Sequence, residues 1–290
     1  MADAATLTTA LPGIVKEIHK ESLTYIARTG VMKNLVTKVG GTGYQLWEPY
    51  FDPTASGAVA VGTEGTDVTT KTSLTTTRRL YTAAEYVKFT IMTDRSVNQA
   101  AENVKTFHAE SHGYEHAAKL ETTLLACLAS GTSTVTATST TGLSWAKVAA
   151  ARTLLEGITK AAPKPYALVL SPAQWYWFAA ALTPNSTVPI AAGSISDSVQ
   201  KQYHLTSLVG GVNVYESSYF TASATGYQKA GMFSKSAINL FMPTGSDYKL
   251  EAQRDATMRG TELVSTMLYG GRIRVPSYCV TVNARSVTPS

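Results

Sequence analysis

The sequence predicts an α+β fold of elongated shape, and three features support this prediction. Residues 94–129 carry a continuous helical pattern, residues 44–92 hold two strand-like stretches set far apart, and residues 248–282 are rich in strands. At about 1.5 Å per residue the helix would be roughly 50 Å long, whereas an average helix has about 11–12 residues. We therefore expect a spine rather than one layer of a compact globule. The length of 290 residues corresponds to roughly two domains.

The N-terminal segment, residues 1–43, predicts a helix followed by a loop. Pro12 stands where a first-turn proline belongs, and Ile18 and Ile26 recur at helical spacing. The segment ends in the glycine-rich stretch 40–43, which is not followed by the Lys-Ser/Thr pair of a phosphate-binding loop. We therefore expect 40–43 to be a flexible joint.

Residues 44–92 predict a long, open hairpin. Its strands are expected at 44–50, which alternates as a strand does, and at 80–92, which is rich in aromatic and β-branched residues. Between them, Phe51 to Thr77 consists largely of Gly, Ala, Ser and Thr. Such a segment buries too little apolar surface to hold itself in place, so we expect something outside the subunit to complete it.

The spine helix shows residues spaced by three and four along one stripe, and Thr93 or Asp94 is expected to cap its start. Gly113, near its middle, is expected to weaken or bend it. The predicted stripe comprises Val97, Ala101, Val104, Phe107, Ser111, Tyr114, Ala118, Leu125 and Leu128.

Beyond the spine, short helices and strands alternate. Ser144 is expected to cap a second helix that ends at Gly157, and Ser171-Pro172 is expected to start a third. Strands are expected at 166–170, 208–215, 248–253, 263–269 and 273–282.

Composition excludes several classes of protein. A hydrophobic fraction of 44% excludes wholesale disorder, and a net charge of +5 without a basic block does not indicate a nucleic-acid reader. Charged residues make up 16%, against about 25% in a usual soluble domain, so we expect neighbours to cover much of the surface. Cys127 and Cys279 are expected to be small buried hydrophobes.

Membrane and secreted proteins are excluded on similar grounds. The longest apolar runs, 166–170 and 175–182, are far shorter than the ~20 residues that cross a bilayer. The N-terminus lacks a basic region followed by an apolar one. We expect an intracellular product with no membrane contact.

One chemical motif stands out. His112, Glu115 and His116 spell H-x-x-E-H, the inverted zinc-protease pattern, and His108 extends the row by one turn. His112 and His116 would lie on one helix face and could both bind a metal. No downstream acidic helix offers an obvious third ligand, so we expect ordinary packing, with no metal and no cofactor. A zinc metallohydrolase is kept as an alternative.

Other catalytic patterns lack their partners. Ser144 begins an S-x-x-K pattern whose companion motifs are missing, and the acidic residues are scattered singly. We therefore expect no catalytic residues and no enzymatic activity.

Arg78 and Arg79 form a basic point on the return strand of the hairpin. Two interpretations stay open: a solvated strand edge that the charges protect, or an inter-subunit ion pair with an acidic group such as Glu64. Together with Lys71, these residues are the candidate subunit contacts.

The order of the parts resembles that of tailed bacteriophage major capsid proteins, the Hong Kong 97 capsid fold. The resemblance covers nearly the whole chain and depends on the order and spacing of several stretches. These are the Glu64-Gly65 turn, 84–90 running into 93–96, 168–175, and 210–217.

The resemblance implies a division of the chain and a function. Residues 1–43 would be the N-terminal arm, 44–92 the extended E-loop, 93–184 with 263–290 the peripheral domain, and 185–262 the axial domain. The implied function is a structural major capsid protein that self-assembles into the hexamers and pentamers of an icosahedral shell enclosing phage DNA.

Partners follow from the same resemblance. The short N-terminal region implies a separate scaffolding protein, and the family implies a portal, a possible decoration protein and non-specific contact with packaged double-stranded DNA. The protein would reside in the virion capsid after assembly in the host cytoplasm. An encapsulin-like nanocompartment, which encloses enzymes, is the alternative that shares the fold.

The composition of Phe51 to Thr77 yields a first test. Trypsin should cut free subunits readily after Lys71, Arg78 or Arg79, and these sites should be protected in assembled shells, where neighbour contacts offset the entropy of ordering. Limited digestion of both forms, followed by mass spectrometry, measures the difference. Equal cleavage or equal protection would contradict the expectation. Deleting Ala55 to Val61 should impair particle formation while leaving the subunit folded.

Overall fold

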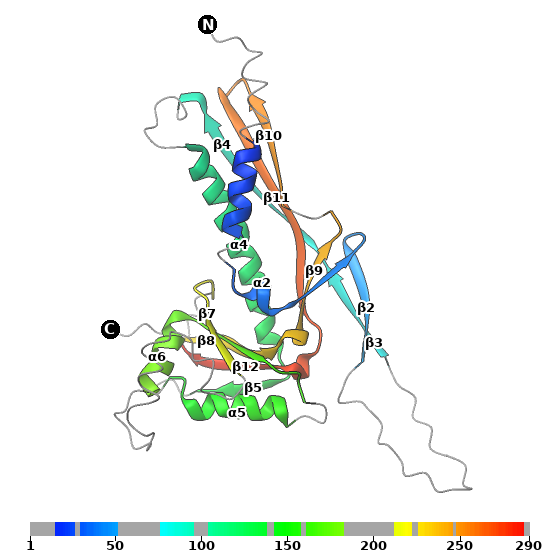
Figure 1. Ribbon diagram of the computed structural model, residues 1–290, viewed down its shortest axis with the longest axis vertical. Helices are drawn as coiled ribbons and strands as arrows, with labels where there is room; N and C mark the ends of the chain where they lie inside the picture. The colour runs from blue at the N-terminus through cyan, green and yellow to red at the C-terminus, as the bar shows by residue number, and fades with distance from the viewer. Residues whose placement is uncertain are drawn as a thin grey trace, which may run out of the picture.

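The computed structural model describes residues 15–26, 30–51, 76–95, 104–137, 142–157, 161–182, 212–221, 226–245 and 248–286. Within these residues the chain forms an elongated α+β molecule with two parts (Figure 1). One part holds a long helix against a sheet, and the other holds a second sheet with two shorter helices. The predicted α+β class is confirmed.

The elongated part is built around one long strand. β11 (Gly260–Ile273) pairs antiparallel with β4 (Ala84–Thr93) on one side and with β10 (Lys249–Asp255) on the other. Its last residues pair with β9 (Ile238–Pro243), and β9 pairs in parallel with β1 (Thr37–Gly41). Among the described residues these five strands form one sheet.

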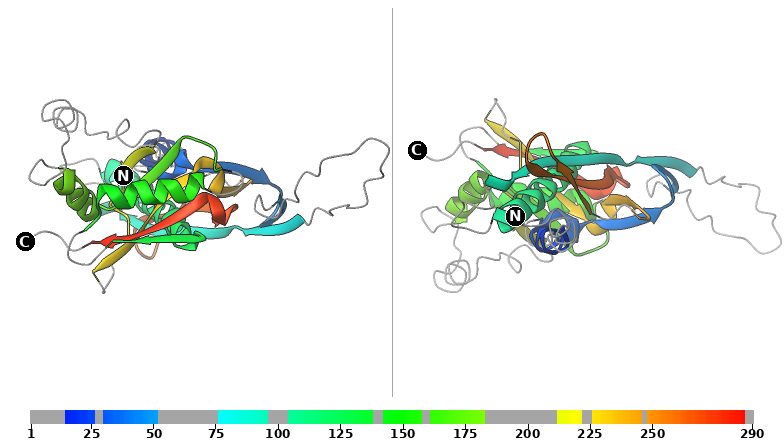
Figure 2. Two further views of the ribbon diagram at one scale, coloured as in Figure 1. Left: turned by 90° about the horizontal axis from the view of Figure 1, so that it is seen from below. Right: turned by 90° about the horizontal axis from the view of Figure 1, so that it is seen from above.

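Two helices cover one face of this sheet. α4 (Val104–Cys127) has 24 residues, about 36 Å at 1.5 Å per residue, and the helix at 15–26 lies beside it (Figures 1 and 2). Ser22 Oγ donates a hydrogen bond of 2.9 Å to the carbonyl oxygen of Ala109, which joins the two helices. Residues 96–103 of the predicted spine lie outside the described residues.

The buried face agrees with the predicted stripe at Leu125 and Leu128, which are buried, and differs from it further toward the N-terminus of α4. Phe107 and Tyr114 are 69% and 41% exposed, whereas His112 and His116 are buried. The reason is that Gly113 lies against the helix at 15–26, where a Cβ would meet Tyr25 Cβ at 2.6 Å. The helix continues through Gly113 without interruption, so this glycine allows close helix packing and is not the expected weak point.

The second part is a mixed five-stranded sheet in the described residues, with α5 (Trp145–Glu156) and α6 (Pro172–Leu182) packed on it (Figure 1). Ser144 stands at the N-cap of α5 as predicted, although its side chain makes no capping hydrogen bond. In order across the sheet, the strands are β5 (Ser133–Thr136), β12 (Cys279–Arg285), β8 (Tyr227–Ser234), β6 (Tyr166–Leu170) and β7 (Val212–Glu216). The short helices are α2 (Met32–Leu35), η2 (Leu128–Ser130), η3 (Lys235–Ala237) and η4 (Pro276–Tyr278).

The grouping of segments differs from that expected. The sequence groups 93–184 and 263–290 with the spine, but β5, β6, α5, α6 and β12 belong to the second sheet. Conversely β10, expected in the group 185–262, pairs with β11 beside the spine. Strand partners distant in sequence decide this arrangement, and the linear order of elements does not reveal them.

The glycine stretch 40–43 is not the free joint that the sequence suggests. Gly40 and Gly41 end β1 and pair with Met242 and Pro243 of β9. A Cβ on Gly41 would lie 3.1 Å from Phe241 Cε2, so the absence of a side chain permits close packing. Gly43, with φ of +82°, makes the turn into β2.

Glu121 ties the chain after the first helix to α4. This carboxylate is 1% exposed, and its two oxygens accept hydrogen bonds from the backbone nitrogen of Met32 at 3.2 and 3.0 Å. Ser217 Oγ donates a third bond of 3.1 Å. Burial raises the pKa of Glu121, while these hydrogen bonds lower it and so support the charged form.

Both cysteines are free and buried, as predicted. Burial raises the pKa of Cys127 to about 11 and that of Cys279 to about 12, so both stay protonated at neutral pH. None of the helices within the described ranges combines the length and the apolar character needed to span a bilayer.

Replacing Gly113 by Ala should lower the free energy of unfolding by about 1–3 kcal/mol. Overlap with Ser22 and Tyr25 should outweigh the gain of about 1 kcal/mol in helix propensity, because a Cβ would also meet the Ser22 carbonyl oxygen at 2.8 Å. Urea denaturation of the subunit measures the change. Ala126→Ser, at an exposed position of the same helix, should change stability by no more than about 0.5 kcal/mol. A Gly113→Ala variant as stable as the wild type would contradict this account.

Candidate functional site: hairpin base and histidine row

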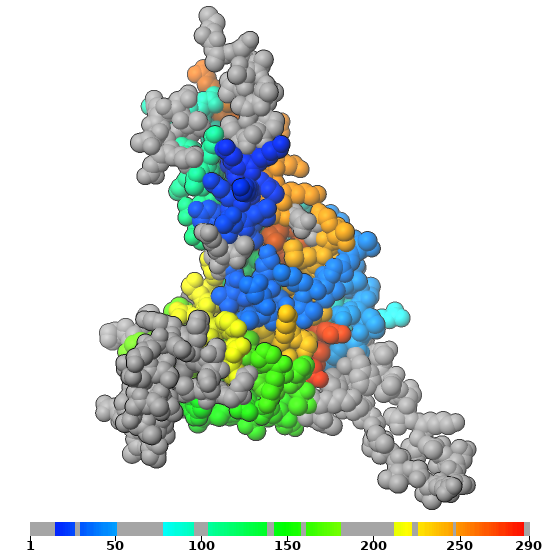
Figure 3. Space-filling view, in the orientation of Figure 1, coloured from blue at the N-terminus to red at the C-terminus, as the bar shows by residue number. Residues whose placement is uncertain are grey.

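The predicted hairpin is present at its base. β2 (Gln45–Phe51) pairs antiparallel with β3 (Thr76–Thr82), and the chain continues after Ala83 into β4. Alternation along β2 directs Glu48 and Tyr50 toward the body of the protein and Trp47 away from it. In the space-filling view, residues 30–51 (blue) spread across the middle of the molecule toward the hairpin (Figure 3).

Glu48 anchors this base to the sheet. Its Oε1 lies 3.0 Å from Arg274 Nη2, and its Oε2 accepts a 2.9 Å hydrogen bond from Asn239 Nδ2. Asn239 Nδ2 also lies 3.1 Å from Tyr81 Oη, and burial followed by the neighbouring Glu48 raises the pKa of this phenol. Arg272 Nη1 donates a 2.6 Å bond to the carbonyl oxygen of Leu80. The base is therefore held by charge-assisted bonds to β9 and to the end of β11.

The two arginines among the candidate contact residues differ in their exposure at the hairpin base. Arg78 is exposed, whereas Arg79 is half-buried with its guanidinium carbon 4.9 Å from the centroid of the Tyr50 ring. Arg79 is therefore not a fully solvated charge at a strand edge, which was the first of the two interpretations. The second interpretation, an ion pair between subunits, stays a prediction. Glu64 and Lys71 lie outside the described residues.

Several large apolar side chains on this side of the molecule are exposed, which the sequence did not indicate. Trp47 is 57% exposed, and on β4 Val87 and Phe89 are 58% and 51% exposed. Register places Val87 and Phe89 opposite Thr266 and Val264 on the sheet face that turns away from α4. The signal available in the sequence was the abundance of aromatic and β-branched residues in 80–92, which cannot tell a covered face from an open one.

The histidine row of α4 forms a chain of hydrogen bonds with two hydroxyl groups. His112 Nδ1 lies 2.6 Å from Ser265 Oγ, and His112 Nε2 lies 2.7 Å from Thr90 Oγ1. Ser265 Oγ also lies 2.8 Å from His116 Nε2, and Thr90 Oγ1 lies 3.1 Å from His108 Nδ1. The chain joins α4 to β11 and β4, and it engages both ring nitrogens of His112.

The third member of the motif points elsewhere. The Glu115 side chain is 67% exposed and lies 3.9 Å from Lys88 Nζ. Lys88 Nζ in turn donates to Ser111 Oγ at 2.8 Å. Within the described residues, no group of three or more His, Cys, Asp or Glu side chains is placed to hold a metal ion. The geometry of the row is that of a satisfied polar core between helix and sheet.

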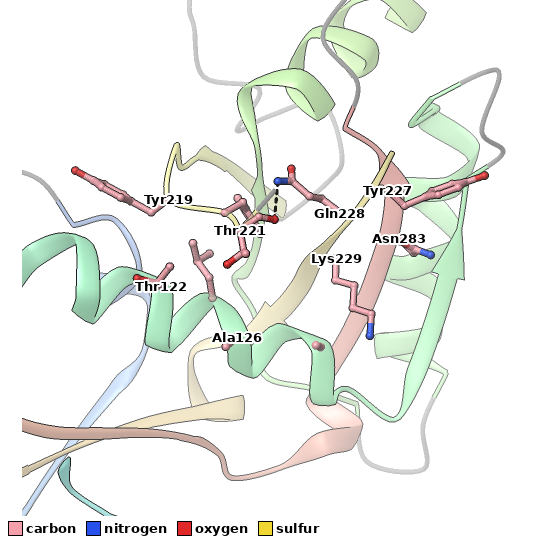
Figure 4. A pocket seen from close by; sticks show the side chains of 11 residues that line it. Thr122, Ala126, Tyr219, Thr221, Tyr227, Gln228, Lys229 and Asn283 are labelled. Carbon is pink, nitrogen blue, oxygen red and sulfur yellow. Dashed lines mark hydrogen bonds between the residues drawn. The ribbon is translucent and has the colours of Figure 1, made fainter. Parts of the chain in front are cut away.

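A hollow of about 420 Å³ lies between the C-terminal half of α4 and the strands β8 and β12 (Figure 4). Gln228 Nε2 donates a 3.0 Å hydrogen bond to the carbonyl oxygen of Thr221 across it. Tyr219, Tyr227 and Lys229 supply its ionisable groups among the described residues. We find no paired nucleophile and base in this lining.

The sequence matches the family model described as phage capsid protein over residues 75–282, more than half of the chain. The chain belongs to the phage capsid protein family. The match begins at β3 of the capsid protein and includes α4, most of β12 and the other strands of both sheets except β1.

Solved structures share the fold of the capsid protein. The capsid structure of cyanophage P-SCSP1u superposes with a TM-score of 0.68 at 13% identity, covering 90% of this chain and 89% of that chain. A structure from Mycobacterium phage Bobi gives 0.66 at 14% identity, covering 88% and 90%. The virus-like particle from Pyrococcus furiosus gives 0.62 at 10% identity, covering 92% and 98%. No curated protein matches the sequence.

These comparisons confirm two predictions and separate the alternatives. The Hong Kong 97-like fold is confirmed by the structures, and the structural role of a major capsid protein is confirmed by the family match. The fold alone would not distinguish a phage capsid from other shells, because a virus-like particle also has it. The family match is what favours the phage capsid, and none of the comparisons favours a nanocompartment or a hydrolase.

The histidine row should make the capsid protein sensitive to acid. Burial, followed by the charge of Lys88, lowers the pKa of His112 from 6.5 to about 4, and burial also lowers the pKa of His108 and His116. The unfolded chain therefore binds the proton more tightly, so the free energy of unfolding should fall as pH drops from about 6.5 to about 4, by up to about 3 kcal/mol from His112. The pKa of Glu121 is raised in the folded state, so protonation of this carboxyl group at low pH favours folding and partly offsets the loss of stability from the histidines.

His112→Gln should flatten this pH dependence, which urea denaturation at several pH values measures. Gln174→Ala is the control, because it removes a buried but non-ionisable group and should lower stability equally at every pH. The same acid slope in the wild type and in His112→Gln would contradict the role assigned to this histidine.

Proposed function

We propose that the capsid protein self-assembles through hexamers and pentamers into an icosahedral shell that encloses double-stranded phage DNA. The observation that carries the proposal is the family match over residues 75–282. The low charged fraction of 16% supports it, because a subunit covered by neighbours needs less solubilising charge.

The parts of the subunit suit distinct roles in such a shell. Residues 1–43 serve as the N-terminal arm, and the hairpin within 44–92 serves as the E-loop that reaches a neighbour. We assign α4 with β4, β10 and β11 to the peripheral domain, and the sheet of β5, β12, β8, β6 and β7 to the axial domain. This assignment replaces the linear boundaries by strand pairing. Each unit then has an apolar cluster of its own, and a further cluster joins the two units.

The contact residues are proposed on the same basis. Arg78 and Arg79, at the base of the hairpin, would pair with acidic groups of a neighbour, and Glu64 and Lys71 would take part from the same segment. A separate scaffolding protein, a portal and a possible decoration protein complete the proposed partners, with assembly in the host cytoplasm and non-specific contact with DNA. The role is structural, without catalysis.

Electron microscopy of purified protein tests the proposal. Wild-type protein, expressed alone and together with a candidate scaffolding protein, should sediment as large particles that appear as closed shells in negative stain. Deletion of α4 residues 104–127 serves as an unfolded control that cannot assemble. A protein that remains a compact monomer at high concentration in both cases would overturn the proposal.

A further inference from the structure

A basic groove separates the base of the hairpin from the end of α4. It has a volume of about 790 Å³, and its walls come from the last turns of α4, from β3 and from the end of β11. Its charged lining consists of Arg79, Lys119 and Arg272, and none of its described lining residues is an Asp or Glu. Three cationic side chains therefore line one hollow whose described lining holds no carboxylate, with Lys119 Nζ 5.5 Å from the centroid of the Tyr86 ring and Arg272 Nη1 bonded to the Leu80 carbonyl oxygen.

The carboxylates nearby are already engaged. Glu48 is bonded to Arg274 and Asn239, and Glu115 lies beside Lys88. Some other cations form ion pairs within the chain, as Arg254 does with Asp94 at 2.5 Å. The charge of the groove is therefore not neutralised by residues around it in the described chain.

Arg79 shows the same deficit at atomic level. Its Nε is buried and has no hydrogen-bond partner among the described residues. A buried donor without an acceptor costs about 1–3 kcal/mol, and more when it belongs to a charged group. A carboxylate fits a guanidinium through two parallel hydrogen bonds, so an incoming acidic side chain would compensate the charge of Arg79 at the wall of the groove.

The opposite charge lies on another surface of the same chain. Glu85 of β4, Glu251 of β10 and Glu262 of β11 lie on the sheet face that turns away from α4, as the register and alternation of the strands require. None of the three forms an ion pair among the described residues. The exposed Val87 and Phe89 lie on this face as well. Lys249 of β10 lies on this face too, so the three carboxylates outnumber one cation there. We call this surface the acidic sheet face.

We propose that the basic groove binds carboxylates from the acidic sheet face of a second copy of this chain. The inference rests on the proposed function, because assembly brings copies into contact. The two surfaces differ, so the contact is head-to-tail, and such contacts build rings when the rotation between copies closes. Exposed Val87 and Phe89 would add apolar burial around the ion pairs, which lowers the local dielectric and strengthens them.

The geometry favours a peptide carboxylate over nucleic acid. Arg79 is half-buried at the wall of a groove of about 790 Å³, where single side chains can enter but a duplex about 20 Å wide cannot. A phosphate ligand is therefore treated as an outcome of the test.

Charge reversal tests the contact. The groove variant carries Lys119→Glu and Arg272→Glu, the face variant carries Glu85→Lys and Glu262→Lys, and a fourfold variant carries all four changes. Each double variant should lower the fraction of associated subunits at least tenfold, and the fourfold variant should restore it, because the charges are again complementary. Lys38→Glu with Lys147→Glu, which changes two cations outside the groove, is the control matched in net charge and should associate as the wild type does.

Analytical ultracentrifugation measures association, and thermal unfolding verifies that each variant is folded. Arg79→Gln, which keeps hydrogen-bonding capacity but removes the charge, should weaken association without destabilising the subunit. Association of the double variants at wild-type level, or failure of the folded fourfold variant to recover, would overturn the proposal. A second outcome would also overturn it: groove variants that associate as the wild type does but bind a DNA oligonucleotide tenfold more weakly in a mobility-shift assay. That outcome would assign the groove to nucleic acid.

The same experiment separates the two proposals. Wild-type protein that forms small oligomers with the expected charge pattern, but no closed shells, supports the groove contact and contradicts the proposed shell. Closed shells with unaffected groove variants support the shell and contradict the groove contact.

Discussion

The structure depends on the pairing of one strand, β11, with neighbours on both of its sides. Its first ten residues are hydrogen-bonded to β4, most of them also to β10, and its last four to β9. Backbone groups that are buried must be paired, so a strand engaged in this way cannot shift register without breaking several ladders together. The position of α4, of the hairpin base and of β9 all follow from this one strand.

The buried face of α4 is unusual for a spine helix because it contains polar side chains. α4 buries His112, His116 and Glu121 where a spine helix would ordinarily bury leucine or valine. Each of these groups has partners on another element: Ser265 and Thr90 for the histidines, and the backbone of Met32 for the carboxylate. Polar groups satisfied in this way specify one position of a helix more sharply than apolar contacts, since any displacement leaves a buried group unpaired.

Among the residues that the structure describes, no helix covers the other face of the same sheet (Figure 2). Layered proteins normally bury both the apolar face of a sheet and that of a helix, yet Val87 and Phe89 stay half or more exposed. At the hairpin base, Trp47 is exposed while Glu48 on the next residue is anchored by Arg274. The subunit thus holds its contact elements rigidly at their base and leaves apolar surface uncovered, as suits a phage capsid protein that is one part of a larger assembly.

Much of the local structure was determined by the sequence itself. Short-range patterns suffice for the buried strand at 166–170, the start of α6 at Pro172 and the two strands of the hairpin base, because periodicity and turns act between neighbours in the chain. The start of α5 after Ser144 was also located from the sequence, although the serine side chain makes no capping hydrogen bond. The family resemblance was available for a related reason: the order of these elements survives when individual residues change.

Tertiary structure alone decided which elements share a sheet and which face of α4 is buried. Phe107 and Tyr114 fit an apolar stripe, but Gly113 admits a second helix on the other side, and contact between segments about ninety residues apart leaves no local pattern. The basic groove has the same origin, since Arg79, Lys119 and Arg272 come from three separate elements. Periodicity reports that a face exists, whereas only the packing of distant segments determines what covers it.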